Sequence, residues 1–187
     1  MSRSKEAEVQ NHLHKTEPRW FAVYTRNKSE KYVLDKLSKK GIEAYVPLLH
    51  FTRKYKSKTK QVELPLINCY VFVKILKEDY IRVLQTENVI SFLKLRNNLI
   101  AIPENEIDTL RWVVGEKLTV KVDENICFAE GVAVEVIAGN LTGLKGKIVK
   151  RKNKKHFLVA LKTIGYTLNV DISQDLLQRT DPLLATG

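Results

Sequence analysis

Residues 64–75 constrain the fold more than any other stretch, because they join a proline turn signal to the strongest strand pattern in the chain. Their second half contains Tyr-Val-Phe-Val, and side chains on a strand point alternately to its two faces. Tyr70 and Phe72 therefore share one face, while Val71 and Val73 share the other. Since both faces are apolar, we predict a central strand that is either covered on both sides or keeps its aromatic face for a partner.

The composition narrows the class of protein. The chain has 187 residues, of which 44% are hydrophobic, and this is enough for a packed core in one large domain or two small ones. Its formal net charge of +11 favours contact with a nucleic acid or another anionic surface. No apolar run approaches the roughly 20 residues that span a bilayer, and the N-terminus lacks an apolar signal core. We therefore expect a cytoplasmic protein.

The residues that usually bind metals or carry out catalysis are scattered. Cys69 and Cys127 are isolated thiols, as is typical of a reducing compartment. The histidines lack cysteine or carboxylate neighbours at the spacing of a zinc site. The sequence shows no paired carboxylates, no nucleophile beside a base and no phosphate-binding glycine loop at a usable spacing. We expect no metal, no cofactor and no catalytic residue.

The beginning of the chain predicts a tail, a strand and a helix. Residues 1–17 are polar and aperiodic, so we expect a flexible tail. Residues 20–25 are aromatic and β-branched, which favours a strand. A helix should follow, with Asn27 and Glu30 as its capping box and Gly41 at its end. Its buried stripe is expected to consist of Val33, Leu34 and Leu37.

The pattern of strands mixed with helices continues to residue 114. Residues 42–46, 89–95 and 99–102 are predicted strands, and residues 78–86 are a predicted short helix. A second helix should begin near Pro103. The expected inward-facing residues of these two helices are Ile81 and Leu84, and Ile107, Leu110 and Val114. This order of elements indicates an α+β domain, an antiparallel sheet with helices packed on it.

Positive charge is concentrated in the helix entry loop and in a basic arm, residues 53–60. The arm holds five cations and no acid, so it should project as a loop or hairpin, and Tyr55 within it can stack on a base or sugar. A hairpin tip that is only solvated is the alternative. The candidate nucleic-acid-binding residues are Arg26, Lys28, Lys31, Arg53, Lys54, Lys56, Lys58 and Lys60.

The last third of the chain has a different character. Residues 115–127 have a weak pattern and are expected to be a linker or extended connection. Several short alternating stretches then follow, and Gly139, Gly143 and Gly146 supply positions where the backbone can adopt a positive φ. We predict a small β-barrel over residues 128–180 and a tail over 181–187. A second basic cluster, residues 145–155, is interpreted as a solvated turn.

Taken together, these segments resemble the NusG family of transcription elongation factors. The resemblance rests on the aromatic first strand, the basic helix, the Leu-Pro-Leu-Ile-x-x-Tyr-Val-Phe-Val segment and residues 131–146, which look like a KOW motif. It implies an NGN-type antiparallel sheet with flanking helices over residues 18–114, followed by an SH3-like KOW barrel. It also implies that the first domain binds RNA polymerase.

Two segments look most like the specialised antiterminators of the UpxY and RfaH groups, Trp-Phe-Ala-Val-Tyr-Thr-Arg and Gly-Ile-Glu-Ala-Tyr-Val-Pro-Leu. Those proteins act on particular long operons, notably for surface polysaccharides. The resemblance implies that Tyr24, Tyr70 and Phe72 line an apolar hollow for the coiled-coil tip of the largest polymerase subunit. It implies that Asp79 and Tyr80 lie near the opposite side of the clamp. The implied action is bridging of the clamp, beside DNA or nascent RNA, to suppress pausing and termination.

The sequence departs from the family pattern in two places. Asn68-Cys69 stands where family members commonly have Pro-Gly, and Cys69 lacks the conformational freedom of glycine. Thr-Ile-Gly-Tyr stands where an Ile-Phe-Gly-Arg segment is usual. The implied partner surface of the KOW domain, for which a ribosomal protein is one candidate, consists of Leu141, Leu144 and Ile164. A stand-alone RNA-binding or ribosome-associated protein is the alternative interpretation.

Overall fold

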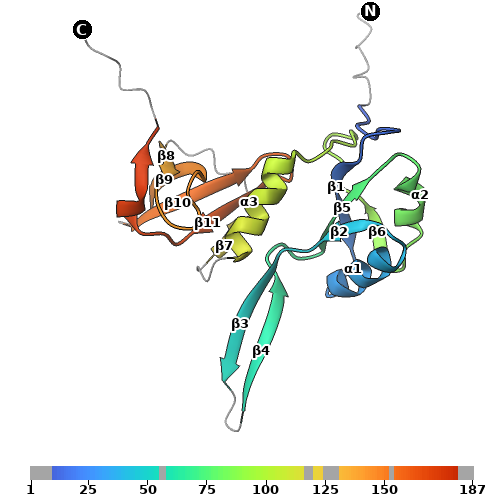
Figure 1. Ribbon diagram of the computed structural model, residues 1–187, viewed down its shortest axis with the longest axis horizontal. Coiled ribbons are helices and arrows are strands. Elements are labelled where there is room, and N and C mark those ends of the chain that lie inside the picture. The colour runs from blue at the N-terminus through green and yellow to red at the C-terminus, as the bar shows by residue number, and fades with distance from the viewer. Residues whose placement is uncertain (1–9, 55–57, 116–119, 124–130, 152–153, 181–187) are drawn as a thin grey trace, which may run out of the picture. The chain divides into compact units, whose positions relative to one another are not determined.

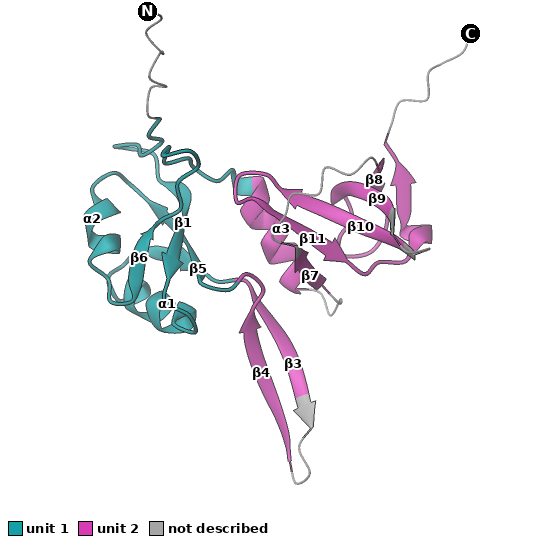
Figure 2. Cartoon of the chain, turned by 180° about the vertical axis from the view of Figure 1, so that it is seen from behind, with its two compact units in different colours: residues 1–46, 68–104 teal, residues 47–67, 105–187 magenta. Residues whose placement is uncertain are grey.

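The computed structural model describes residues 10–54, 58–115, 120–123, 131–151 and 154–180. The chain divides into two compact units (Figure 2), which we describe separately. Unit 1 comprises Met1–Val46 and Asn68–Glu104, and unit 2 comprises Pro47–Ile67 and Asn105–Gly187. Among the described helices, none is long and apolar enough to cross a membrane.

Unit 1 is a four-stranded antiparallel sheet with helices beside it (Figure 1). The strand order is β2 (Glu43–Tyr45), β5 (Tyr70–Ile75), β1 (Arg19–Thr25) and β6 (Val89–Phe92). The helices are α1 (Glu30–Lys39) and α2 (Asp79–Leu84). The predicted α+β domain with flanking helices is thus confirmed. The two central strands, β1 and β5, carry the aromatic segments that the sequence singled out.

The two faces of this sheet follow from the strand register. Val23 pairs with Val71 and with Phe92, so these three side chains share one face, and all are buried. The ring of Tyr80 in α2 stacks on Phe92 at 4.7 Å between centroids, which places α2 against this face. Tyr24, one residue beyond Val23, belongs to the opposite face. Period-two alternation therefore separates an apolar core face from a face that holds the tyrosines.

The central strand is shorter than predicted. Leu64 belongs to β4 (Thr59–Pro65), residues 66–69 form a turn, and β5 begins only at Tyr70. The cause is the backbone of Cys69, which has a left-handed φ of 64°. An extended strand cannot pass through such a residue. The apolar run of residues 64–75 is therefore two strands with a turn between them.

The predicted capping box of α1 is wrong. The helix begins at Glu30, its N-cap is Ser29, and no side chain caps it. The Glu30 carboxylate instead accepts a hydrogen bond from the backbone N–H of Cys69, at 2.6 Å. The other end is as expected, because Gly41 follows the helix with a φ of 74°.

The inward stripes of α2 and α3 (Glu104–Gly115) also differ from the prediction. In α2 the fully buried residue is Val83, whereas Ile81 is 55% exposed. In a helix of only six residues, the sequence pattern does not decide which apolar residues face inward. Packing against the sheet buries the face that carries Val83. In α3 the buried stripe ends at Val113 rather than at Val114.

Residues 10–17 are not a flexible tail. The backbone N–H of His12 donates to Leu99 O, and the N–H of Lys77 donates to His14 O. Residues 99–102, expected to be a strand, make only isolated bridges, from Leu99 to Asn11 and from Ile102 to Trp20. Residues 10–17 are therefore held to other segments of unit 1 by backbone hydrogen bonds. Residues 1–9 and 181–187, also predicted to be tails, lie outside the described residues.

Unit 2 contains a β-hairpin and a barrel-like sheet. The hairpin consists of β3 (Leu48–Lys54) and β4, and it forms its own two-stranded sheet. The second sheet has six strands in the order β12 (Leu177–Arg179), β8 (Val132–Val136), β9 (Lys145–Arg151), β10 (Lys154–Leu161), β11 (Tyr166–Val170) and β7 (Val120–Asp123). A short 3₁₀ helix, η1 (Gln174–Leu176), precedes β12. Strand β7 lies within the predicted linker.

Candidate functional site

Tyr24 and Tyr70 form an aromatic surface on unit 1. They are direct partners in the β1–β5 ladder, and their rings meet edge to face with 5.4 Å between centroids. Tyr24 is 39% exposed, and Tyr70 is half-buried. Such partly exposed aromatic rings are common anchors at protein interfaces, because they bury much apolar area with little loss of rotamer freedom.

Phe72 lies in the same row of side chains but is fully buried. It pairs with Ala22 in β1 and with Tyr45 in β2, whose ring lies 6.5 Å from the Phe72 ring. Phe72 therefore supports the tyrosines and is not itself exposed on the surface. Tyr45 was missed by sequence reasoning. The signal that could have found Tyr45 is the predicted strand over residues 42–46. If that strand is paired with the central strand, Tyr45 comes to lie opposite Phe72.

Asp79 and Tyr80 lie on the other side of the sheet. Asp79 starts α2, and its carboxylate accepts a hydrogen bond at 2.6 Å from Arg82, one helical turn away. Tyr80 is half-buried by its stacking on Phe92. The structure thus brings Tyr24 and Tyr70 together and keeps Asp79 and Tyr80 apart from them.

The candidate nucleic-acid-binding residues of unit 1 surround the start of α1. Arg26, Lys28 and Lys31 are all exposed. The loop that carries Arg26 and Lys28 is fixed by a hydrogen bond from Arg26 N–H to Asn88 O, and Lys28 adopts a left-handed φ of 62°. Lys31 lies in the first turn of α1. A fixed cationic loop next to Tyr24 is suited to phosphate contacts, which give affinity without reading sequence.

The basic arm is the outer half of the β3–β4 hairpin. Arg53 pairs with Lys60, and Lys54 pairs with Thr59. Lys58 and Lys60 are exposed, whereas Tyr55 and Lys56 lie outside the described residues. Of the predicted loop or hairpin, the structure has the hairpin, for the part of the arm that it describes.

The implied KOW partner surface is buried in unit 2. Leu141, Leu144 and Ile164 are each at most 5% exposed. Glu106 of α3 accepts hydrogen bonds from the backbone N–H and the hydroxyl of Thr163, both at 3.0 Å, which ties the helix to the turn before β11. A partner that uses these three apolar residues would have to uncover them first.

In the part of the chain that the structure describes, the resolved pKa shifts lie on two exposed carboxyl groups. A hydrogen bond from Arg19, reinforced by its charge, lowers the pKa of Glu17. The Ser173 hydroxyl donates to Asp175 and lowers the pKa of that carboxyl. Both groups are therefore charged at neutral pH, and neither has the raised pKa expected of a general acid.

An antiparallel α+β unit with a partly exposed aromatic pair, together with a small barrel and basic surfaces, is typical of a protein that binds macromolecules. The family model described as "Transcription termination factor nusG" matches residues 18–111. This match covers half of the chain, and the chain therefore belongs to the NusG family of transcription factors. A comparison with curated protein sequences gives no match.

A solved structure shares the fold of this chain. The structure titled "Domain interaction in Thermotoga maritima NusG" has a TM-score of 0.51 and 18% identity, and the match covers 88% of this chain and 98% of that one. The structure titled "Crystal Structure of MjSpt4:Spt5 complex conformation B" is 20% identical, with a TM-score of 0.31 and coverage of 86% and 96%. At these identities the first match supports the fold of the chain.

Proposed function

We propose that this protein binds elongating bacterial RNA polymerase through the Tyr24–Tyr70 surface of unit 1. The mutually packed pair of exposed Tyr24 and half-buried Tyr70 carries the proposal, because a helical tip needs an apolar hollow with aromatic walls. Membership of the NusG family supports polymerase as the partner. The coiled-coil tip of the largest subunit is the proposed ligand, with Asp79 and Tyr80 at the opposite side of the clamp. The site of action would then be the cytoplasm.

The proposed mechanism is stabilisation of the closed clamp, which suppresses pausing and termination. Bridging favours the closed state only to the extent that the protein binds it more tightly than the open state. Arg26, Lys28 and Lys31 would contact upstream or non-template DNA, and the basic arm would add backbone contacts to DNA or nascent RNA. Phosphate contacts of this kind position the protein but do not select a sequence.

Replacing both Tyr24 and Tyr70 with alanine is expected to weaken binding to purified polymerase about tenfold or more, since two interface anchors are lost together. Tyr32→Ala is the matched control, because Tyr32 is also 39% exposed but lies on α1. Binding is measured by biolayer interferometry, and circular dichroism checks folding. Polymerase affinity equal to that of the wild type in a folded double variant would rule out this surface.

The operon-specific role of the UpxY and RfaH groups is proposed for this chain on the resemblance of its first strand and of residues 41–48. Cells expressing the protein can be crosslinked and the associated transcripts sequenced. Transcripts are expected to come from one or a few long operons, with surface polysaccharide operons among them. Even coverage of all transcription units would instead indicate a general elongation factor.

A further inference from the structure

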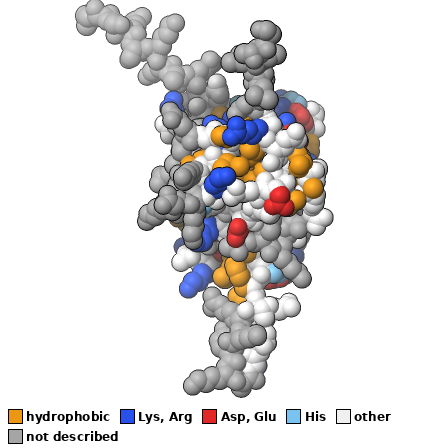
Figure 3. Space-filling view, turned by 90° about the vertical axis from the view of Figure 1, so that its left-hand side faces the viewer, with side chains coloured by type: hydrophobic (Ala, Val, Ile, Leu, Met, Phe, Trp, Pro, Cys, Tyr) orange, Lys and Arg blue, Asp and Glu red, His pale blue; other side chains and the backbone are white. Residues whose placement is uncertain are grey.

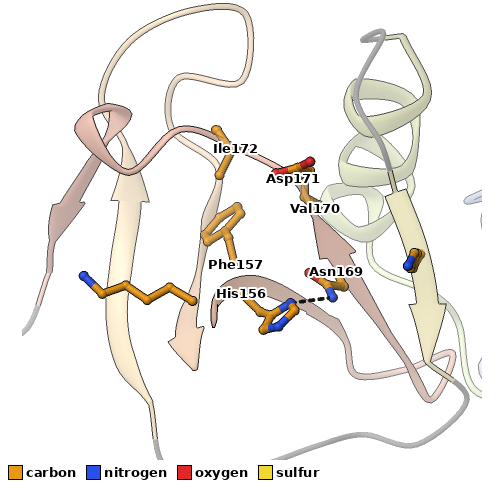
Figure 4. Close-up of a pocket in the computed structure, with 8 residues that line it drawn as sticks. His156, Phe157, Asn169, Val170, Asp171 and Ile172 are labelled. Atoms are coloured by element: carbon orange, nitrogen blue, oxygen red, sulfur yellow. Dashed lines mark hydrogen bonds between the residues drawn. The ribbon is translucent and has the colours of Figure 1, made fainter. Parts of the chain in front are cut away.

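A polar groove on the barrel of unit 2 has no role in the proposed function. Its volume is about 340 Å³, within the range of small-molecule sites. Residues of β7, β10, β11 and the segment after β11 line it (Figure 4). The lining residues that matter here are Lys121, Lys155, His156, Phe157, Asn169 and Asp171.

His156 and Asn169 form a hydrogen-bonded pair in this groove, with 3.0 Å between Asn169 Nδ2 and His156 Nδ1 (Figure 4). An amide nitrogen can only donate, so Nδ1 accepts and the proton of the neutral imidazole lies on Nε2. The pair therefore offers one donor, Nε2–H, beside one acceptor, Asn169 Oδ1. The exposed edge of an unpaired nucleobase also presents a donor next to an acceptor, so it can form complementary hydrogen bonds with this pair.

Two lysines line the same groove, Lys121 and Lys155. Lys121 is the ladder partner of Asn169, and Lys155 precedes His156. Both are exposed, and the Lys155 ammonium donates to Gln174 Oε1 at 2.9 Å. Among the described residues that line the groove, Asp171 is the single acid, so the net charge of these residues is positive. Phosphate groups next to a bound base would contact these two lysines.

Basic residues also follow one another in the neighbouring β9–β10 ladder, whose register places Lys150 opposite Lys155 and Arg151 opposite Lys154. Figure 3 shows one face of the molecule, on which Lys and Arg side chains lie around a hydrophobic patch and acidic side chains lie beside it.

We propose that the groove binds one nucleotide of a single-stranded nucleic acid, with its base edge at His156 and Asn169 and its flanking phosphates at Lys121 and Lys155. The site differs from the basic arm and from the α1 loop in position and in chemistry. Those surfaces present exposed cations, whereas the groove adds a fixed donor and acceptor. It would hold the strand by base and backbone together.

The test measures binding of nine-nucleotide homopolymers, as RNA and as DNA, to the whole chain by fluorescence anisotropy. Lys121→Ala with Lys155→Ala is expected to weaken binding about tenfold and to reduce the salt slope by about 1.4, or about 0.7 for each phosphate contact. The matched control is Lys145→Ala with Lys162→Ala, which removes the same charge from exposed barrel lysines outside the groove. Equal losses in the two double variants would overturn the proposal.

The base contact is tested with Asn169→Leu, which keeps the shape and removes the acceptor. The wild type is expected to prefer one homopolymer about fivefold or more, and the variant is expected to bind all of them alike. No preference in the wild type would overturn the base contact. If the groove binds as proposed, comparing the RNA and DNA homopolymers identifies its ligand. Tighter binding of RNA indicates RNA, and equal binding indicates either nucleic acid. The groove variants should bind polymerase normally, so failure here leaves the proposed function standing.

Discussion

Replacing Gly146 with alanine is expected to destabilise the barrel by about 3 kcal/mol or more, the upper range for overpacked sites. A Cβ built on Gly146 would lie 2.5 Å from the carbonyl oxygen of Leu158 and 2.5 Å from Cε2 of Phe157. The first atom belongs to the backbone of β10, and the second belongs to a buried ring. Neither atom can move away without opening the β9–β10 ladder, so the clash with the added methyl group would strain the barrel.

The measurement is hydrogen exchange of barrel amides in the whole chain, with urea unfolding as a second probe. Gly115→Ala is the control, because a Cβ there meets nothing within 4 Å and the backbone φ is not left-handed. That variant should change stability by less than about 0.5 kcal/mol, as surface substitutions usually do. Protection of the β9 and β10 amides equal to the wild type in Gly146→Ala would contradict the expected clash.

The second large effect is expected for Glu30→Ala, which should destabilise unit 1 by about 3 kcal/mol. Glu30 is 3% exposed, and its carboxylate accepts the Cys69 N–H. Without it, a part-buried donor loses a charged acceptor, at a cost of about 1–3 kcal/mol. The left-handed backbone of Cys69 also loses its restraint, and this conformation costs a non-glycine residue about 1–2 kcal/mol. Because Tyr70 follows directly, polymerase affinity should fall as well.

Thermal unfolding of a set of variants separates the two contributions. Glu30→Gln keeps an acceptor oxygen and should cost less than the alanine variant. Cys69→Gly should stabilise the wild type by about 1 kcal/mol, because glycine adopts a positive φ freely. The same change should recover more in the Glu30→Ala background, since both residues hold one turn. Equal effects in the two backgrounds would show that the residues act independently.

Local patterns predicted much of unit 1. Period-two alternation placed Tyr70 and Phe72 on one face of their strand, and the resemblance to the NusG family added Tyr24. The β1–β5 register makes Tyr24 and Tyr70 neighbours. The turn before β5 was harder, because its geometry depends on Glu30, which is 39 residues away in the chain. A local capping rule assigned the Glu30 carboxylate to its own helix. In the folded protein it instead accepts a hydrogen bond from the distant Cys69 N–H, a contact that a local rule cannot predict.

The glycines of the barrel illustrate a second limit. Gly139 and Gly143 adopt the positive φ predicted from the sequence, whereas Gly146 does not. Gly146 is required for a different reason, the close approach of β10, and that requirement is visible only once the strands are paired. Burial of Leu141, Leu144 and Ile164 likewise depends on packing that their local pattern does not encode.

Strand β7 has a consequence for dissecting the protein. By pairing with β11 it covers an edge of the six-stranded sheet that would otherwise present unpaired N–H and C=O groups. Exposed strand edges recruit other chains and promote aggregation. A barrel fragment that begins at residue 128, where the sequence alone places the domain boundary, lacks this cover. Studies of the isolated barrel should therefore start before residue 120.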